Sequence, residues 1–278
     1  MKKVAIGSAG AVLLFYVAVL LINIGKGIPM EAQDLDSERY QTVAIFGATG
    51  TIGDGLLKAA INDPDVDRIR VVTRRPSPRI EEGVAAGKVD MIVHKDYLDY
   101  SAIRDVLIDV DAVFWAIGLS AVGLDEETYR EIHVDFPSRF VAEWLSASNK
   151  DEISFHYVSG SGAKAESRMM WARVKALAES ELERLARSAN LRVVSYRPAL
   201  ILPTEAEAHL GHRVLYAIFA PIKSAVAAES IGHAMLEVSA RGQQYGNGTI
   251  LENGDIIGLS DARQERAQCI DCDQGKER

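Results

Sequence analysis

The chain has 278 residues, of which 48% are hydrophobic, and this is enough to bury a substantial core. Its 31 basic and 39 acidic side chains give a net charge of −8 without long runs of one sign, which argues against a nucleic-acid-binding surface. Both cysteines, Cys269 and Cys272, lie in the polar end CIDCDQGKER, so no disulfide can hold the body of the protein together.

An uncharged apolar segment, Val4–Ile24, follows the first three residues. As a helix it would extend ~31 Å, about the thickness of the hydrocarbon core of a bilayer. The alternative is a cleaved signal peptide, whose apolar region is typically only about 7–15 residues and ends in small side chains. This segment ends with Ile22-Asn23-Ile24. We therefore expect residues 1–25 to form an N-terminal transmembrane helix anchored in the lipid bilayer.

The composition changes twice more along the chain. Residues 26–40 are polar and acidic without apolar periodicity, which predicts a linker. A globular domain is expected over residues 41–259, followed by a polar tail over residues 260–278. The spacing of Cys269 and Cys272 is typical of redox motifs, but no strand and helix flank them, so we interpret them as part of a solvated tail.

Apolar segments alternate with helical patterns in the expected domain. The apolar segments have the near-continuous character of strands buried on both faces: TVAIFG, IRVVTR, VDMIVH, DAVFWAIG, ISFHYVSG and LRVVSYRPA. Helical patterns lie between them at Asp54–Asn62, Tyr100–Ile108, Asp125–Ala147 and Trp171–Ala189. This alternation predicts an α/β fold, a doubly wound parallel sheet with helices on both faces. Residues 200–244 are less regular, with two helix-like stretches before a last strand-like segment, GTILENGDI, and such elements commonly build the substrate side.

The first strand leads directly into FGATGTIGDGLLKAA, where Gly47, Gly50 and Gly53 have the spacing G-x-x-G-x-x-G. Glycines allow a tight turn and a close approach of the backbone to a pyrophosphate, and the following helix directs amide donors at the anion. A glycine triplet alone is a weak signal, but one between a buried strand and an amphipathic helix is strong. The sequence therefore predicts a dinucleotide-binding site; the alternative is simply a tight turn.

Arg74 and Arg75 follow the second strand. Sites that prefer NAD place an acidic residue near this position to hold the ribose 2′-hydroxyl, whereas paired guanidinium groups suit a 2′-phosphate. We therefore expect NADP as the cofactor, with NAD as the alternative. No metal site is predicted, because His209 and His212 have no third ligand at a suitable spacing.

These motifs, together with DYLDYS after the third strand, AIG after the fourth, VSGSGA after the fifth and MWARVKALAESELE beyond it, resemble the atypical short-chain dehydrogenase/reductase superfamily. Within this superfamily the chain is similar to the Tat-interacting, tumour-suppressor-like proteins, often labelled NAD-dependent epimerase-like. The resemblance covers roughly Gln41 to Leu259 and implies a Rossmann-type fold that binds NAD(P).

The resemblance also implies roles for particular residues. Pyrophosphate contacts are implied for Gly47, Thr49, Gly50, Thr51, Ile52 and Gly53, and adenosine ribose contacts for Arg74 and Arg75. The adenine would be bordered by Asp96, Tyr97 and Leu98, and the central part of the cofactor by Ala116, Ile117 and Gly118. Lys175 would reach the nicotinamide ribose, and Ser159 or Ser161 would lie beside the reacting carbonyl.

Trp171 departs from the pattern of this superfamily, in which a tyrosine donates a proton to the carbonyl and the lysine lowers the pKa of that tyrosine. An indole N–H can donate a hydrogen bond but cannot supply the proton. Tyr196 could replace the tyrosine only if its side chain points into the pocket. Lys175 is interpreted as a cofactor contact, and the alternative is an ion pair with Glu179 one turn later.

We therefore expect an oxidoreductase or epimerase-like protein that acts on a small carbonyl or alcohol with weakened proton transfer. The alternative is a non-catalytic dinucleotide-sensing protein that serves interaction or assembly with a protein partner. The flanking charges of the apolar segment barely discriminate its orientation. Because pyridine nucleotides are held mainly inside cells, we expect a single-pass membrane protein with its domain on the cytoplasmic side.

Overall fold

A sheet of seven parallel strands forms the centre of the computed structural model, which describes residues 42–187, 189–205 and 208–274. Its strands are β1 (Thr42–Phe46), β2 (Arg68–Thr73), β3 (Val89–Val93), β4 (Ala112–Trp115), β5 (Ile153–Val158), β6 (Leu191–Arg197) and β9 (Thr249–Glu252). Their order across the sheet is β3-β2-β1-β4-β5-β6-β9. The order reverses between β1 and β4, and folds of this kind bind ligands at the carboxyl ends of the strands beside such a reversal.

The predicted strands are confirmed, since each of them contains a strand of the sheet. Every residue of β1 and β5 is buried, as expected for strands covered on both faces. The register of the central strands is set by Val43 of β1, which pairs with Ile69 of β2 and with Ala112 of β4. The doubly wound α/β fold expected from the alternation of apolar segments is therefore present.

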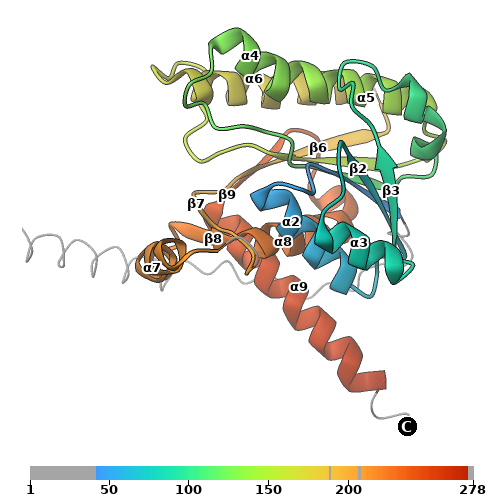
Figure 1. Ribbon diagram of the computed structural model, residues 1–278, viewed down its shortest axis with the longest axis vertical. Coiled ribbons are helices and arrows are strands. Elements are labelled where there is room, and N and C mark those ends of the chain that lie inside the picture. Colours follow the sequence, from blue (N-terminus) through green and yellow to red (C-terminus); the bar gives the residue numbers. More distant parts are fainter. Residues whose placement is uncertain (1–41, 188, 206–207, 275–278) are drawn as a thin grey trace, which may run out of the picture.

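Two layers of helices cover the sheet (Figure 1). On one face lie α4 (Glu126–Arg130), α5 (Phe136–Ala147) and α6 (Met170–Ala186), with a π-helical turn at Glu131–Asp135 and a 3₁₀ helix at Ser101–Leu107. On the other face lie α2 (Thr51–Asn62), α3 (Pro78–Ala85), α8 (Ala228–Ala240) and α9 (Asn253–Gln274). The core beneath α5 and α6 is rich in aromatic rings, such as Phe46 stacked on Trp115 with ring centroids 4.7 Å apart, whereas the opposite core is mainly aliphatic.

A small second sheet lies beside the main one and consists of β7 (Leu200–Leu202) and β8 (Ala225–Ala227). The helix α7 (Leu210–Phe219) connects its two strands, and short 3₁₀ helices follow at Ala220–Ile222 and Gly242–Gln244. None of the residues of α7 is buried. This sheet and helix α3 were not expected from the sequence, because strands of three residues and a short polar helix have too little apolar periodicity to be recognised.

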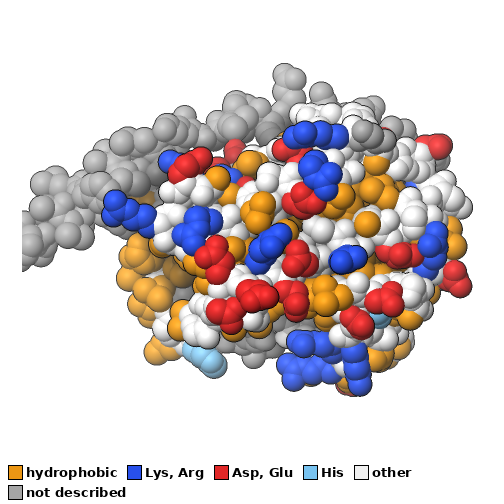
Figure 2. Space-filling view, turned by 90° about the horizontal axis from the view of Figure 1, so that it is seen from above, with side chains coloured by type: hydrophobic (Ala, Val, Ile, Leu, Met, Phe, Trp, Pro, Cys, Tyr) orange, Lys and Arg blue, Asp and Glu red, His pale blue; other side chains and the backbone are white. Residues whose placement is uncertain are grey.

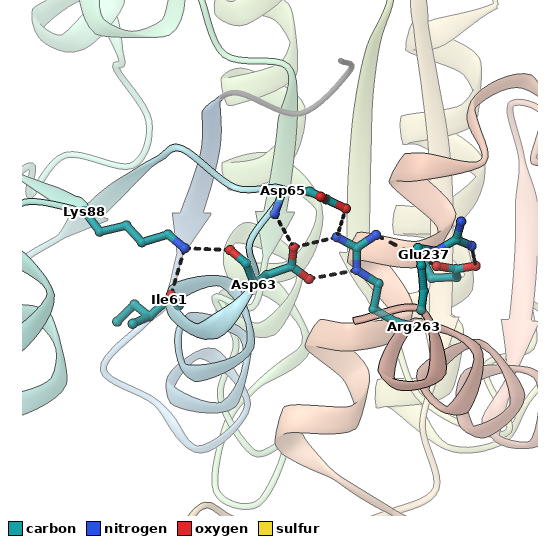
Figure 3. A network of polar contacts seen from close by, with 7 residues as sticks. Ile61, Asp63, Asp65, Lys88, Glu237 and Arg263 are labelled. Atoms are coloured by element: carbon teal, nitrogen blue, oxygen red, sulfur yellow. Dashed lines mark hydrogen bonds and ion pairs between the residues drawn. The ribbon is translucent and has the colours of Figure 1, made fainter. Parts of the chain in front are cut away.

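Helix α9 was not expected from the sequence, and it covers most of the segment interpreted as a polar tail. A network of buried charges attaches it to α2 and α8 (Figure 3). Arg263 of α9 contacts the carboxylate of Asp63, with Nε 2.7 Å from Oδ2, and its Nη2 lies 2.7 Å from Oδ2 of Asp65. Glu237 of α8 accepts hydrogen bonds from Arg241 and Arg266. A helix with a polar sequence is therefore packed against the domain through ion pairs.

The expectation of a single-pass membrane protein is corrected by the structure. In the residues that it describes, no helix combines the length and the apolar character needed to cross a bilayer. The segment Val4–Ile24, on which the expectation rested, lies outside the described residues.

Acidic and basic side chains are interspersed over the surface formed by α4, α5 and α6, which Figure 2 shows from above. Two ion pairs from this layer are typical: Arg173 of α6 with Glu126 at 2.8 Å, and Arg184 with Glu181 at 2.6 Å. The face shown therefore carries no continuous field of one sign.

Candidate functional site

The glycine motif forms the turn between β1 and α2, and two of its glycines have no room for a side chain. Gly47 has a φ of +81°, and a Cβ there would lie 2.6 Å from the backbone carbon of Ala116. A Cβ on Gly53 would lie 2.0 Å from the carbonyl oxygen of Gly47. The turn closes with a hydrogen bond of 3.0 Å from Gly50 N to Gly47 O. Gly50 is also the N-cap of α2 and has no side chain to cap the helix, so the first backbone donors of α2 receive no hydrogen bond from an N-cap side chain.

The ends of β2 and β3 form the next part of the crevice. Arg74 and Arg75 are exposed directly after β2, and Thr73 fixes this turn because its Oγ1 donates to Arg75 O at 2.7 Å. Tyr97 is buried after β3, and the positive charge of Arg74 partly offsets the rise in the pKa of Tyr97 that burial causes. Arg74 and Tyr97 therefore lie near one another at this edge of the sheet.

Asp96 and Leu98 complete the turn after β3. Oδ1 of Asp96 accepts a hydrogen bond of 3.0 Å from Leu98 N, and 45% of Leu98 is exposed. An exposed leucine beside a polar turn offers an apolar surface for a flat ring.

The end of β4 approaches the glycine turn. Ala116 N donates to Phe46 O at 3.0 Å, which keeps the segment Ala116–Gly118 beside Gly47. A Cβ on Gly118 would lie 2.7 Å from Cε1 of His133. The segment expected behind the cofactor thus lies between the glycine turn and a buried histidine.

Two serines follow β5. Their backbone amides continue the contact with the next strand, because Ser159 N donates to Tyr196 O at 2.8 Å and Ser161 N donates to Pro198 O at 2.9 Å. The hydroxyl of Ser159 is buried and has no hydrogen-bond partner among the described residues, whereas Ser161 is exposed. Buried hydroxyl groups normally have a partner, so Ser159 is the serine that a bound molecule could satisfy.

Lys175 lies on the second turn of α6, and only 7% of it is exposed. Its Nζ donates to Val158 O at 2.8 Å and to the hydroxyl of Tyr157 at 3.3 Å. Burial lowers the pKa of Lys175 to about 7, although the negative charge of Glu179 acts in the opposite direction. The lysine is therefore held at the end of β5, beside the residue that precedes Ser159.

The alternative ion pair between Lys175 and Glu179 is not formed. The Glu179 carboxylate instead accepts two hydrogen bonds from Arg197 at the end of β6, from Nε at 2.9 Å and from Nη2 at 2.6 Å. A second carboxylate, that of Glu252, lies 3.1 Å from Nη1 of Arg197. Lys175 consequently lies buried without a carboxylate in direct contact.

Two residues near Lys175 were missed by sequence reasoning. The Tyr157 hydroxyl donates to His133 O at 3.0 Å, and Lys175 Nζ lies 4.8 Å from the centre of the Tyr157 ring. Burial, together with the charge of Lys175, lowers the pKa of His133 to about 3. His133 is a single histidine within a long helical pattern, and only its contact with Gly118 across the fold distinguishes it.

Trp171 covers the loop after β5. Its indole is half-buried, and a Cβ on Gly160 or on Gly162 would lie 3.5 Å or 3.7 Å from its six-membered ring. Tyr196 points away to the other face of the sheet, where its hydroxyl lies 2.8 Å from Nδ1 of the buried His156. The suggestion that Tyr196 replaces the missing tyrosine is therefore wrong.

His209 and His212 lie at the start of α7, where Nδ1 of His212 accepts a hydrogen bond of 3.3 Å from the backbone N–H of His209. Their rings stack with centroids 5.5 Å apart. They therefore cap the first turn of this helix. The side chains of Cys269 and Cys272 lie outside the part of the chain whose side chains are described.

The ends of β1, β4 and β5 carry groups of the kind that a dinucleotide site uses. The glycine turn is too tight for side chains at Gly47 and Gly53, the unpartnered Ser159 hydroxyl can orient a polar group, and Lys175 offers a cationic donor. Such an arrangement can bind a pyrophosphate at one end and hold a carbonyl near a ribose-bound ring at the other.

Comparisons with known proteins agree with this geometry. Residues 43–235 match the family model described as the NAD dependent epimerase/dehydratase family. Protein fmp52, mitochondrial, of Emericella nidulans is 28% identical over 211 residues, which cover 72% of this chain and 87% of that protein. Leucinostatins biosynthesis cluster protein T of Purpureocillium lilacinum is 28% identical over 150 residues, and the match spans only 54% of each protein.

Solved structures share the fold. A 3-oxoacyl-[acyl-carrier protein] reductase from Brucella melitensis in complex with NAD superimposes with a TM-score of 0.61 at 16% identity, over 79% of this chain and 98% of that chain. At this level of identity the similarity shows the Rossmann-type architecture alone. The resemblance inferred from the sequence motifs is confirmed by these matches and by the family model.

Proposed function

The chain belongs to the NAD dependent epimerase/dehydratase family, and from this premise we propose that it binds NADP(H) and acts as an oxidoreductase, or an epimerase-like enzyme, on a small carbonyl or alcohol. Lys175 carries the proposal, because a buried cation at the end of β5, bonded to Val158 O and free of a direct carboxylate contact, is costly unless it serves a ligand.

The proposed binding mode follows the strand ends. The pyrophosphate would lie over Gly47–Gly53, including Thr49, Gly50, Thr51 and Ile52, and the 2′-phosphate would be held by Arg74 and Arg75. The adenine would lie against Asp96, Tyr97 and Leu98, and Ala116–Gly118 would lie behind the central part. Lys175 would lie beside the nicotinamide ribose and Ser159 would orient the substrate oxygen, with exposed Ser161 at the entrance. When bound, the cofactor supplies or accepts the hydride.

Cofactor preference is tested by titrating the protein with NADPH and NADH. Loss of a charge-assisted phosphate contact costs about 1.5–3 kcal/mol, so NADPH should bind about ten- to a hundredfold more tightly. The double variant Arg74→Ala, Arg75→Ala should lose this preference and retain its affinity for NADH. Equal affinity of the native protein for both cofactors would contradict the choice of NADP.

Catalysis is tested by following NADPH oxidation over a panel of aldehydes, ketones and quinones. Because Trp171 stands where a tyrosine would donate the proton, we expect slow turnover by the native protein and a rise of up to ~10²–10⁴-fold in Trp171→Tyr, with cofactor affinity nearly unchanged. The gain would be smaller if the phenol is misplaced in the space left by the indole.

The same tryptophan favours a second function, a dinucleotide-binding protein that senses the cofactor without turnover and serves interaction or assembly. An indole packed over Gly160 and Gly162 gives up no proton, and it closes the loop where a substrate would be protonated. Tight NADPH binding without oxidation by any compound of the panel would support this function instead.

A further inference from the structure

The proposed reduction needs a proton donor other than Trp171. When hydride reaches a carbonyl carbon, the oxygen gains negative charge and must take up a proton. Four ionisable groups lie around Lys175: Tyr157 on β5, His133 in the π-helical turn, Tyr129 on α4 and Glu179 on α6 itself.

Each of these four groups is a poor acid near neutral pH. Burial raises the pKa of Tyr157 well above its usual value, and its proton is already bonded to His133 O. Tyr129 is also raised in pKa by burial, and its ring lies against His133 with centroids 4.1 Å apart. His133, with a pKa of about 3, carries no acidic imidazolium proton at neutral pH. Glu179 is bound to Arg197 as a carboxylate.

Lys175 differs from all four. An ammonium group has three protons, and in the part of the chain that the structure describes Nζ has two acceptors, Val158 O and the Tyr157 hydroxyl. One proton therefore remains for a ligand. The carboxylate of Glu179, one turn further along α6, would bind this proton tightly if it were free to approach.

Arg197 prevents that approach. It binds both oxygens of Glu179 from the neighbouring strand β6, and Glu252 of β9 holds Arg197 from the other side. Glu179 is itself only 7% exposed, and its carboxylate is held by Arg197 and not by the lysine, so it acts on Lys175 only from a distance. The ammonium is left buried without a carboxylate in contact, and burial lowers its pKa to about 7.

We propose that Lys175 itself delivers the proton to the substrate oxygen, and that Arg197 is a positioning residue that makes this proton available by sequestering Glu179. The inference rests on the proposed reductase function. Bound NADPH would supply the hydride for the new C–H bond and would thereby be oxidised. As the carbonyl π bond breaks, its electron pair takes a proton from Nζ, and the neutral amine recovers a proton from water. In alcohol oxidation the same amine accepts the proton.

The first experiment measures the pH dependence of kcat with saturating NADPH and 4-nitrobenzaldehyde as probe. Because the acid must be protonated, kcat should be constant at low pH and fall about tenfold per pH unit above about 7. In Lys175→Arg the cation and its donors remain, but the proton is held too firmly to be transferred. We expect kcat to fall at least ~10²-fold, with the Kd for NADPH changing less than about tenfold.

The second experiment uses two substitutions that should shift the alkaline limb of the kcat–pH profile in opposite directions. Arg197→Gln frees Glu179 to stabilise the ammonium, so the limb should move to higher pH by about one unit, whereas Glu179→Gln should move it to lower pH. Glu252→Gln is the matched control, because it removes a partner of Arg197 without freeing Glu179. Both Arg197 and Glu179 line a pocket of about 540 Å³ at the sheet edge, so water can solvate the altered side chains.

A third measurement is independent of turnover. NMR titration of lysine labelled with ¹³C at Cε, assigned with Lys175→Arg, should show one lysine of the cofactor-free protein titrating near pH 7. Titration of Lys175 near the ordinary value, an unmoved limb in both Arg197→Gln and Glu179→Gln, or kcat retained in Lys175→Arg would each overturn the inference, even with NADPH binding intact. Failure to bind NADPH or NADH at all would instead overturn the proposed function.

Discussion

Two buried cations on opposite faces of the sheet differ in whether a carboxylate contacts them. Arg263, 3% exposed, contacts Asp63, Asp65 and Glu237, so every charge around it has a partner of opposite sign (Figure 3). Lys175 is 7% exposed and has two neutral oxygen acceptors and no carboxylate in contact. A buried cation that is fully paired holds helices together, whereas one that is left unpaired can exchange its proton or bind a ligand.

The largest effect on stability is expected where the paired cation is removed. Arg263→Leu would leave the Asp63 carboxylate buried without its counter-charge, while Glu237 keeps Arg241 and Arg266, and this should lower the free energy of unfolding by about 3–5 kcal/mol. Urea unfolding followed by circular dichroism measures this loss. A loss below about 1 kcal/mol would show that the contact between Arg266 and Glu237 suffices to hold α9.

Removing the unpaired cation, Lys175, should instead stabilise the protein. Lys175→Met should raise the free energy of unfolding by about 1–3 kcal/mol at pH 7, because it removes a buried charge and loses only two hydrogen bonds to neutral oxygens. The folded pKa of Lys175, about 7, lies below its ordinary value of 10.5, so the unfolded chain binds the extra proton between these values.

The stability of the native protein should accordingly contain a contribution that rises with pH from about 7 to about 10.5, and Lys175→Met should abolish it. The gain from the substitution is then largest below pH 7 and disappears towards pH 10.5. Unfolding midpoints measured from pH 6 to pH 10 test this, and a variant less stable than the native protein at pH 6 would contradict the comparison.

Tyr196→Phe, on the side of the sheet where Arg263 lies, should lower stability without changing turnover. It deprives Nδ1 of the buried His156 of its hydroxyl partner, which should cost about 1–2 kcal/mol, and turnover should not change because Tyr196 faces away from Lys175. Parallel denaturation and NADPH oxidation assays check both statements. Lost turnover in a folded variant would return Tyr196 to the list of proton donors.

The smallest effect on stability is expected for an exposed ion pair, with which the two buried cations can be compared. Arg104 and Glu143 lie 2.9 Å apart with side chains 47% and 25% exposed, so Glu143→Gln should cost about 0.2–1 kcal/mol. Raising the salt concentration should reduce even this difference, whereas the loss in Arg263→Leu should depend little on salt.

Helix α9 shows why part of the fold was not predicted. Its buried face includes Ile256 and Leu259 near the start, but further along the buried residue is Arg263. An apolar periodicity stops where ion pairs replace hydrophobic contacts, so the segment was interpreted as a polar tail. The short helix α3 was missed for a related reason, since only Ile80 and Gly83 are buried in it.

By itself, the sequence determined the succession of the central strands and helices along the chain and the glycine turn between β1 and α2. Periodicity and turn chemistry act over a few neighbouring residues, so both can be recognised locally. It also placed Trp171 and Lys175 one turn apart. Only the tertiary structure decided that Tyr196 points to the face of the sheet opposite Lys175 and that His133 and Tyr157 lie near Lys175. It also decided that Glu179 pairs with Arg197 and not with Lys175. Those contacts join segments distant in the chain, and no local spacing encodes which side chains will share a buried volume.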